Sequence, residues 1–117
     1  MAGFVLEKIG IHHKFISRTA KPESNCISYI DVTPELIKQY KLIVNCTPIG
    51  MFPAVNGLPQ LPYQSCTSEH IFYDMVYNPG QTLFLSEGEK RGATTKNGLE
   101  MLQIQAELNW KIWNNQL

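Results

Sequence analysis

The apolar residues of this chain form short strand-like runs that alternate with helical segments. Runs of apolar and β-branched residues typical of strands occur at 13–17, 28–30, 42–44, 71–73 and 93–95. Helical segments are expected at 2–9, 33–40, 82–91 and 97–113. Strands that alternate with helices predict an α/β fold with a mostly parallel sheet, because parallel strands need crossover connections.

Capping residues support the predicted helix boundaries. Thr33 followed by Pro34 is a hydroxyl N-cap with proline at the first helical position. Asn97, three residues before Glu100, resembles a capping box. Gly10 is a suitable C-cap for the helix at 2–9, which has no capping residue before it. An apolar stripe on the last helix is expected to face the core; it consists of Leu99, Leu102, Ala106, Trp110 and Trp113.

Length, charge and cysteine usage restrict the class of protein. The 117 residues, 44% of them apolar and 17% charged, indicate one globular domain. Ten basic and ten acidic side chains balance, which argues against a nucleic-acid-binding surface. No apolar run is long enough to span a membrane, and no secretory signal is visible. Cys26, Cys46 and Cys66 match neither a zinc site nor a disulfide framework, so reduced thiols in the cytoplasm are expected; no metal site is predicted.

Polar clusters follow three of the predicted strands. They are Ser17-Arg18-Thr19, the segment 45–51 and the segment 74–79. Ligands of open α/β sheets bind at the carboxyl ends of the strands, so this coincidence favours a binding site there. Each cluster also has a plainer interpretation as a surface turn, because Asn, Thr, Pro and Gly are frequent in turns.

Individual side chains add detail to this hypothesis. Arg18, with Lys21 close by and no acidic residue in the cluster, suits the 2′-phosphate of NADP better than the ribose hydroxyl of NAD. Tyr77 is either a half-buried aromatic residue or a phenol presented to a polar substrate. Gly98 and Gln105 lie on one helix face, about 10 Å apart along the axis. On this face the glycine allows the close approach of a ring, and the glutamine can hydrogen-bond a substrate hydroxyl. The alternative for Gln105 is an ordinary solvated side chain.

Three motifs together resemble shikimate dehydrogenase. They are NCTPIGM at 45–51, DMVYNPGQTLFL at 74–85 and KNGLEMLQIQA at 96–106, and ISRTAK at 16–21 is similar to the NADP-phosphate segment of that family. The resemblance covers nearly the whole chain and matches the carboxyl-terminal, NADP-binding half of the enzyme. It implies a Rossmann-like domain over 1–117, whose final helix, 97–114, packs toward the substrate cleft.

The resemblance also implies roles for particular residues. Those expected to hold the adenosine 2′-phosphate are Ser17, Arg18, Thr19 and Lys21. Asn45, Cys46 and Thr47 would line the dinucleotide near its ribose, while Met75 and Gly98 would contact the nicotinamide. Tyr77 and Gln105 would reach shikimate or 3-dehydroshikimate, which the enzyme interconverts with NADP as cofactor in aromatic amino-acid biosynthesis.

Two departures from the family pattern change the expectation for activity. No glycine-rich phosphate loop of the GxGxxG kind occurs in the sequence, and the first strand of the fold is expected to be missing with it. The catalytic lysine and aspartate of the family belong to the substrate domain, so no catalytic residue is assigned and the chain alone, as a fragment, is expected to be inactive. Strand edges left unpaired predict self-association. The alternative function is a non-catalytic nucleotide-binding or interaction module. The sequence does not decide whether the preferred substrate is shikimate or quinate.

Overall fold

The computed structural model describes residues 8–10, 12–19 and 25–114. The strands are β1 (Phe15–Ser17), β2 (Cys26–Ser28), β3 (Leu42–Asn45), β4 (Ile71–Asp74) and β5 (Thr94–Lys96). The α-helices are α2 (Pro34–Gln39), α3 (Leu83–Lys90) and α4 (Leu99–Trp113), and the short 3-10 helices are η2 (Tyr29–Asp31) and η3 (Tyr63–Ser65). The predicted helix at 2–9 falls almost entirely outside the described residues; Gly10, its predicted C-cap, has a φ of 79°.

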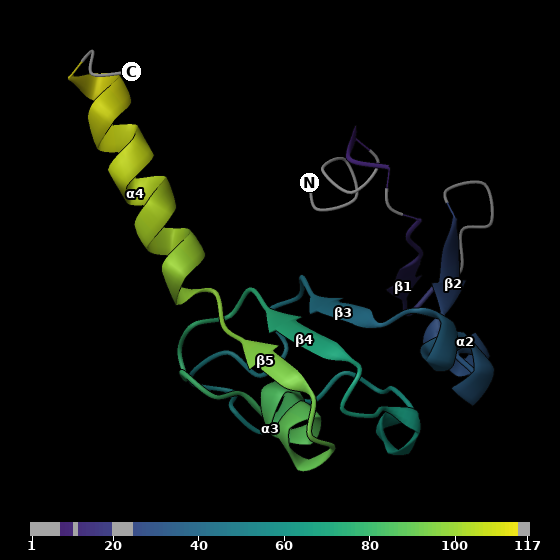
Figure 1. Ribbon diagram of the computed structural model, residues 1–117. Coiled ribbons are helices and arrows are strands. Elements are labelled where there is room, and N and C mark those ends of the chain that lie inside the picture. Colours follow the sequence, from purple (N-terminus) through teal and green to yellow (C-terminus); the bar gives the residue numbers. More distant parts are fainter. Residues whose placement is uncertain (1–7, 11, 20–24, 115–117) are drawn as a thin grey trace.

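The strands form two parallel sheets. One contains β1 and β2, and the other has the order β3-β4-β5, so the α/β class with parallel sheets is confirmed. Helix α3 packs against β4 and β5 (Figure 1). In the β3–β4 register Asn45 lies opposite Asp74, which brings the carboxyl ends of these two strands to one edge of the sheet.

Local hydrogen bonds explain where the elements begin and end. Thr33 caps α2 by accepting a hydrogen bond from the amide of Leu36 at 3.2 Å, as predicted. The strand predicted at 28–30 is wrong, because β2 covers Cys26–Ser28 and the Ser28 hydroxyl then accepts from the Ile30 amide and starts η2. Helix α4 begins at Leu99, after Gly98, which is two residues later than predicted. Oδ1 of Asn97 accepts from the Leu99 amide at the start of the helix, and its Nδ2 donates to the Gly80 carbonyl.

Aromatic packing holds α3 onto its sheet. Phe72 of β4 and Phe84 of α3 are almost fully buried, and their ring centroids lie 5.0 Å apart. Tyr63 packs against both rings. A Cβ atom on Gly88 would lie 2.7 Å from Cγ of Phe72, so the absent side chain lets the helix rest directly on this ring.

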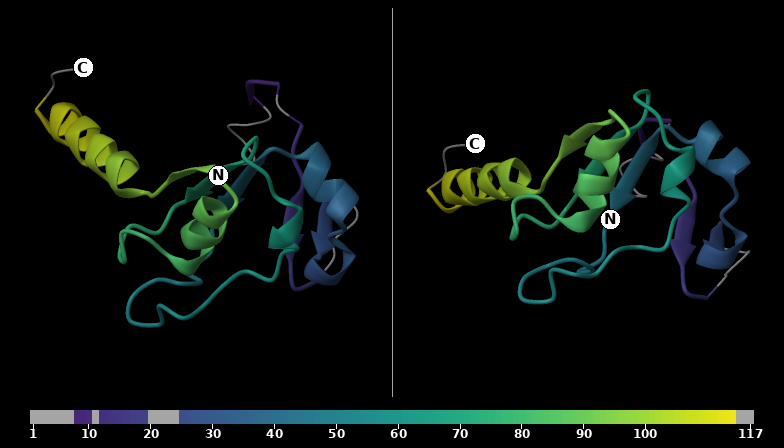
Figure 2. Two further views of the ribbon diagram at one scale, coloured as in Figure 1. Left: turned by 60° about the horizontal axis from the view of Figure 1, so that its bottom comes forward. Right: turned by 90° about the horizontal axis from the view of Figure 1, so that it is seen from below.

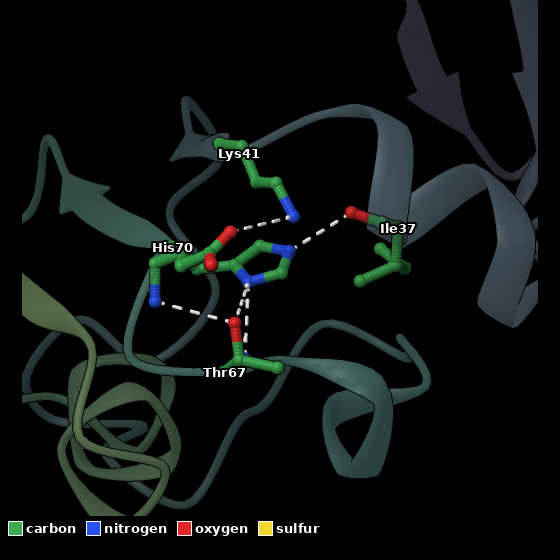
Figure 3. A network of polar contacts seen from close by, with 5 residues as sticks. Ile37, Lys41, Thr67 and His70 are labelled. Atoms are coloured by element: carbon green, nitrogen blue, oxygen red, sulfur yellow. Dashed lines mark hydrogen bonds and ion pairs between the residues drawn. The ribbon is translucent and has the colours of Figure 1, made fainter.

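A fully buried histidine joins α2 to the start of β4 (Figure 3). The amide of Thr67 donates to Nδ1 of His70 at 3.0 Å, so Nδ1 is an acceptor and the proton lies on Nε2. Nε2 then donates to the carbonyl of Ile37 at 2.8 Å. Because His70 precedes β4, this link lies at the end of the strand opposite the polar clusters.

The apolar stripe predicted on the last helix does not lie in the core. No residue of α4 is buried, and Trp110 and Trp113 are 62% and 77% exposed. The physical reason is position: α4 extends away from the sheet, as all three views show (Figures 1 and 2), so no described element covers the stripe.

An apolar groove of about 500 Å³ separates the two sheets. Phe15 and Ile16 of β1 line one side of it, and residues 42–45 of β3 line the other. Among the described residues, β1 and β3 are edge strands that pair with β2 and β4 respectively, so neither has a strand neighbour on its other side. Exposed strand edges are templates for pairing with a further chain.

We expect the chain to self-associate through these edges. Light scattering at micromolar concentration should give a mass above that of the 13.3 kDa monomer. Replacing the partly exposed Phe15 by lysine should shift the chain toward monomer, because a charge at an edge opposes strand pairing. Trp113→Lys on α4 is the matched control. A monomer mass for the unaltered chain would contradict the predicted association. If Trp113→Lys gives a monomer while Phe15→Lys still associates, the association does not run through the strand edges.

His70→Ala should lower the free energy of unfolding by about 2–4 kcal/mol, because it leaves the Ile37 carbonyl and Thr67 amide unpaired and opens a cavity. Urea titration measures the change. The control is Glu69→Ala, which removes only the exposed 3.4 Å ion pair with Lys41 and should change stability by less than about 1 kcal/mol. Equal losses in the two variants would show that the buried histidine has no special role.

Candidate functional site

The three predicted polar clusters do follow strand ends. β1 ends at Ser17, β3 at Asn45 and β4 at Asp74. Since β3 and β4 are parallel neighbours, the segments that follow them leave the sheet side by side. The segment after β1 leaves the other sheet, across the groove.

A cavity of about 420 Å³ lies between the segments that follow β3 and β4. Four residues singled out from the sequence line it, and they are Cys46, Thr47, Met75 and Tyr77. The sequence did not single out the other lining residues, which are Pro48, Met51, Phe52, Val76 and Asn78. All nine lie within the segments 45–51 and 74–79 or next to them, so their position after strand ends was the available signal.

Asn45 is buried behind the cavity wall, which it supports through hydrogen bonds, and it does not line the cavity itself. It is 5% exposed, and its Oδ1 accepts from the Thr47 amide at 3.1 Å and from the Thr47 hydroxyl at 2.6 Å. Its Nδ2 donates to the Ile49 carbonyl, while the Ile49 amide donates to the Thr47 hydroxyl. The turn interpretation is thus correct for Asn45, and it is compatible with a site because the turn builds the wall.

Gly98 fits tightly against the backbone of the opposite wall. A Cβ atom there would lie 2.1 Å from the carbonyl oxygen of Met75, closer than any real contact. The Gly98 amide also donates to the Val76 carbonyl at 3.2 Å. The sequence predicted a close approach of a ring to this glycine, and the structure shows a close approach of the Met75 backbone.

Ser17 and Thr19 form a local turn after β1. The Ser17 hydroxyl donates to the Thr19 carbonyl at 2.7 Å and accepts from the Thr19 amide at 3.2 Å. Arg18 is exposed, and no ion pair found among the described residues involves it. Burial raises the pKa of the Tyr29 phenol above its ordinary value, and the positive charge of Arg18 offsets part of this increase. The guanidinium of Arg18 therefore lies near Tyr29. Lys21 lies outside the described residues.

Tyr77 and Gln105 occupy different surroundings. Tyr77 is 48% exposed and lines the cavity, so its phenol is accessible to a ligand there. Gln105 is exposed on α4 and lines neither the cavity nor the groove. The structure therefore brings Tyr77, but not Gln105, to the site.

Cys46 is a neutral lining residue. Partial burial of the sulfur raises the pKa of its thiol, and the charge of Asp74 raises it further, although the residue as a whole is exposed. A thiol with a raised pKa is a poor nucleophile because little thiolate is present. Cys26, Cys46 and Cys66 are all free, and no group of metal-ligating side chains occurs in the part of the chain that the structure describes. No described helix is long and apolar enough to cross a membrane.

Asp74 and Thr82 were not singled out by the sequence. Asp74 is fully buried at the end of β4, and Thr82 is 1% exposed at the N-terminus of α3. The hydroxyl of Thr82 donates to Oδ2 of Asp74 at 2.6 Å. The only signal in the sequence was a carboxylate directly after an apolar strand.

Known proteins resemble the chain in sequence and in structure. It is 36% identical over 110 residues to the shikimate dehydrogenase (NADP(+)) of Methanococcus maripaludis, which covers 92% of this chain and 38% of the relative. Over 72 residues it is 44% identical to that of Desulforamulus reducens, covering 62% of this chain and 25% of the relative. Shikimate 5-dehydrogenase from Thermus thermophilus, solved in complex with NADP(H) and shikimate, superposes with a TM-score of 0.77 at 28% identity, over 97% of this chain and 44% of that one.

No family model matches the chain. The chain spans between a quarter and two fifths of the length of the curated relatives it matches. The similarity nevertheless reaches across both sheets and the segments that form the cavity, because the superposition covers nearly all of this chain.

Gly98→Ala should lower the free energy of unfolding by about 1–3 kcal/mol, since a methyl group would collide with the Met75 carbonyl and force the cavity wall to move. Urea titration measures this loss. Gly80→Ala is the matched control, because its Cβ would meet nothing closer than 3.9 Å, and we expect a change within about 0.5 kcal/mol. If Gly98→Ala is as stable as the control, the close approach is not a constraint on the fold.

Proposed function

We propose, from the premise that this chain is a relative of the shikimate dehydrogenases, that it forms the NADP-binding part of such an oxidoreductase. The reaction is reversible hydride transfer, in which NADPH reduces 3-dehydroshikimate to shikimate. The observation that carries the proposal is the cavity, where Cys46, Thr47, Met75 and Tyr77 converge from two strand ends.

The cavity suits the reacting end of the cofactor and the substrate. Its volume of about 420 Å³ lies in the range of small-molecule sites, and its walls combine apolar side chains with a few polar groups. We assign Met75 to the face of the nicotinamide. The phenol of Tyr77 both donates and accepts hydrogen bonds, so it suits the hydroxyl or carboxylate of shikimate.

The groove connects this cavity with the end of β1. Cys46 and Thr47 line both hollows, and Ile16, next to Ser17, lines the groove. A dinucleotide that runs along the groove mouth would place its adenosine end at Arg18. The guanidinium has no ion pair among the described residues and can fork to two oxygens of the 2′-phosphate. We assign Ser17, Thr19 and Lys21 to the same phosphate.

Further groups of the complete site come from outside this sequence. No GxGxxG run is present to cradle the pyrophosphate, and no lysine or aspartate in the matched motifs corresponds to the catalytic pair that the resemblance implies. We therefore propose that the 117-residue chain alone transfers no hydride. We also assign α4 to the side of the substrate, where Gln105 would reach shikimate once the exposed face of the helix is covered.

Binding of 2′,5′-ADP tests the cofactor assignment without requiring catalysis. In NMR spectra of the ¹⁵N-labelled chain, 2′,5′-ADP should shift the amides of Ser17, Arg18 and Thr19 more than 5′-AMP does, because only the former carries the 2′-phosphate. Arg18→Ala should weaken this binding roughly ten-fold. Arg18→Lys should weaken it less, since lysine keeps the charge but loses the fork. Equal responses to the two nucleotides would contradict the assignment.

Shikimate and quinate, added in parallel, should shift the amides of residues 75–77. When NADP is added together with shikimate, the chain should form no NADPH, because hydride transfer needs both reactants and the complete site. The second candidate, a non-catalytic nucleotide-binding or interaction module, is favoured by the exposed α4 and the open groove. Micromolar NADP binding without any response to shikimate or quinate would support that module, and shikimate oxidation by the purified chain would overturn the proposed inactivity.

A further inference from the structure

Asp74 is a fully buried carboxyl group surrounded by hydrogen-bond donors. Its Oδ1 accepts from the amide of Val76 at 3.0 Å and from Nδ2 of Asn45 at 3.1 Å. Its Oδ2 accepts from the Thr82 hydroxyl at 2.6 Å, whose oxygen in turn accepts from the Leu85 amide. Both oxygens of Asp74 therefore act as acceptors, and three groups from separate segments donate to them.

The bond to Val76 sets one wall of the cavity. It spans two residues, so it fixes the direction in which the chain leaves β4. Met75 and Tyr77, which line the cavity, stand on either side of Val76 in this segment. The orientation of that wall therefore depends on Oδ1 of Asp74.

The bond to Asn45 sets the opposite wall. Asn45 uses its remaining oxygen to hold the amide and hydroxyl of Thr47, and its amide nitrogen also reaches the Ile49 carbonyl. Thr47 then holds the Ile49 amide. A relay of hydrogen bonds thus runs from Asp74 through Asn45 to the segment that carries Cys46 and Thr47.

We propose that Asp74 is the positioning residue of the cavity: one buried carboxylate holds both walls, and through Thr82 the start of α3, in a fixed arrangement. Asp74 is fully buried and is not among the residues that line the cavity, so it acts through Asn45, Thr47 and Val76. The role of these walls in binding shikimate rests on the proposed function, whereas the hold on the walls is a property of the chain itself.

Paired substitutions separate the two oxygens of the carboxylate. Asp74→Ala removes both acceptors, and Asp74→Asn keeps one oxygen for Val76 and Asn45 while it replaces the acceptor for Thr82. Hydrogen exchange should therefore speed up roughly ten-fold or more at the Val76 and Thr47 amides in Asp74→Ala and much less in Asp74→Asn. Thr82→Val should affect the Leu85 amide and leave the two walls protected, whereas Thr82→Ser keeps the hydroxyl and should resemble the unaltered chain.

His70→Ala is the control for a general loss of stability, because His70 is equally buried at the other end of β4. It should speed exchange throughout the sheet without singling out the walls. If Asp74→Ala gives this same uniform pattern, Asp74 is only a stabilising residue and the proposal is overturned. Should Asp74→Ala not fold, Thr47→Val against Thr47→Ser tests the relay: the Ile49 amide should lose protection only in the valine variant, and equal protection in both would overturn it.

Ligand titration supplies the second arm. In Asp74→Ala the response of residues 75–77 to shikimate should be lost, while the response of Ser17 and Arg18 to 2′,5′-ADP should persist. If exchange in Asp74→Ala is faster at the Val76 and Thr47 amides but the response of residues 75–77 to shikimate is unchanged, the positioning role is overturned. No shikimate response in the unaltered chain would instead overturn the proposed function, and the exchange pattern would still decide whether Asp74 holds the walls.

Discussion

The burial of one carboxylate, Asp74, constrains the arrangement of everything around the cavity. A charge removed from water is strongly destabilising unless donors replace its hydration. None of the ion pairs among the described residues reaches Asp74, so its compensation comes from Asn45, Val76 and Thr82. These donors belong to the end of β3, the segment after β4 and the start of α3. Satisfying the carboxylate therefore assembles the same three segments that shape the site.

The two ends of β4 have different tasks. At one end His70 ties α2 to the sheet through its hydrogen bonds to Ile37 and Thr67, and Ile37 also borders the groove. At the other end Asp74 supports the cavity walls. Between them Phe72 packs the strand onto α3. The cavity thus lies at the carboxyl end of the strand, which is where α/β sheets bind their ligands.

Features that depend on neighbouring residues could be predicted from the sequence. Four of the predicted strands share at least two residues with the observed strands, whereas the one predicted at 28–30 shares only Ser28 with β2. Hydroxyl caps such as Thr33 marked helix starts. The convergence of Cys46, Thr47, Met75 and Tyr77 followed from the rule that parallel strands end at one edge.

Features that depend on distant partners could not be predicted in this way. Asn45 and Asp74 are 29 residues apart, so nothing local showed that they bond. The stripe on α4 read as core because periodicity reports an apolar face without reporting what covers it. The same limit applied to Gly98, because nothing in the sequence showed that the backbone of Met75 passes beside it.

The uncovered apolar surfaces lie directly beside the cavity. The groove between β1 and β3 shares Cys46 and Thr47 with the cavity. Gly98, the N-cap residue of α4, is in contact with the Met75 backbone of the other wall. Each of these uncovered surfaces therefore shares residues or a backbone contact with one wall of the cavity. Both walls are hydrogen-bonded to Asp74, so the groove and the start of α4 each adjoin a wall that this one carboxyl group holds.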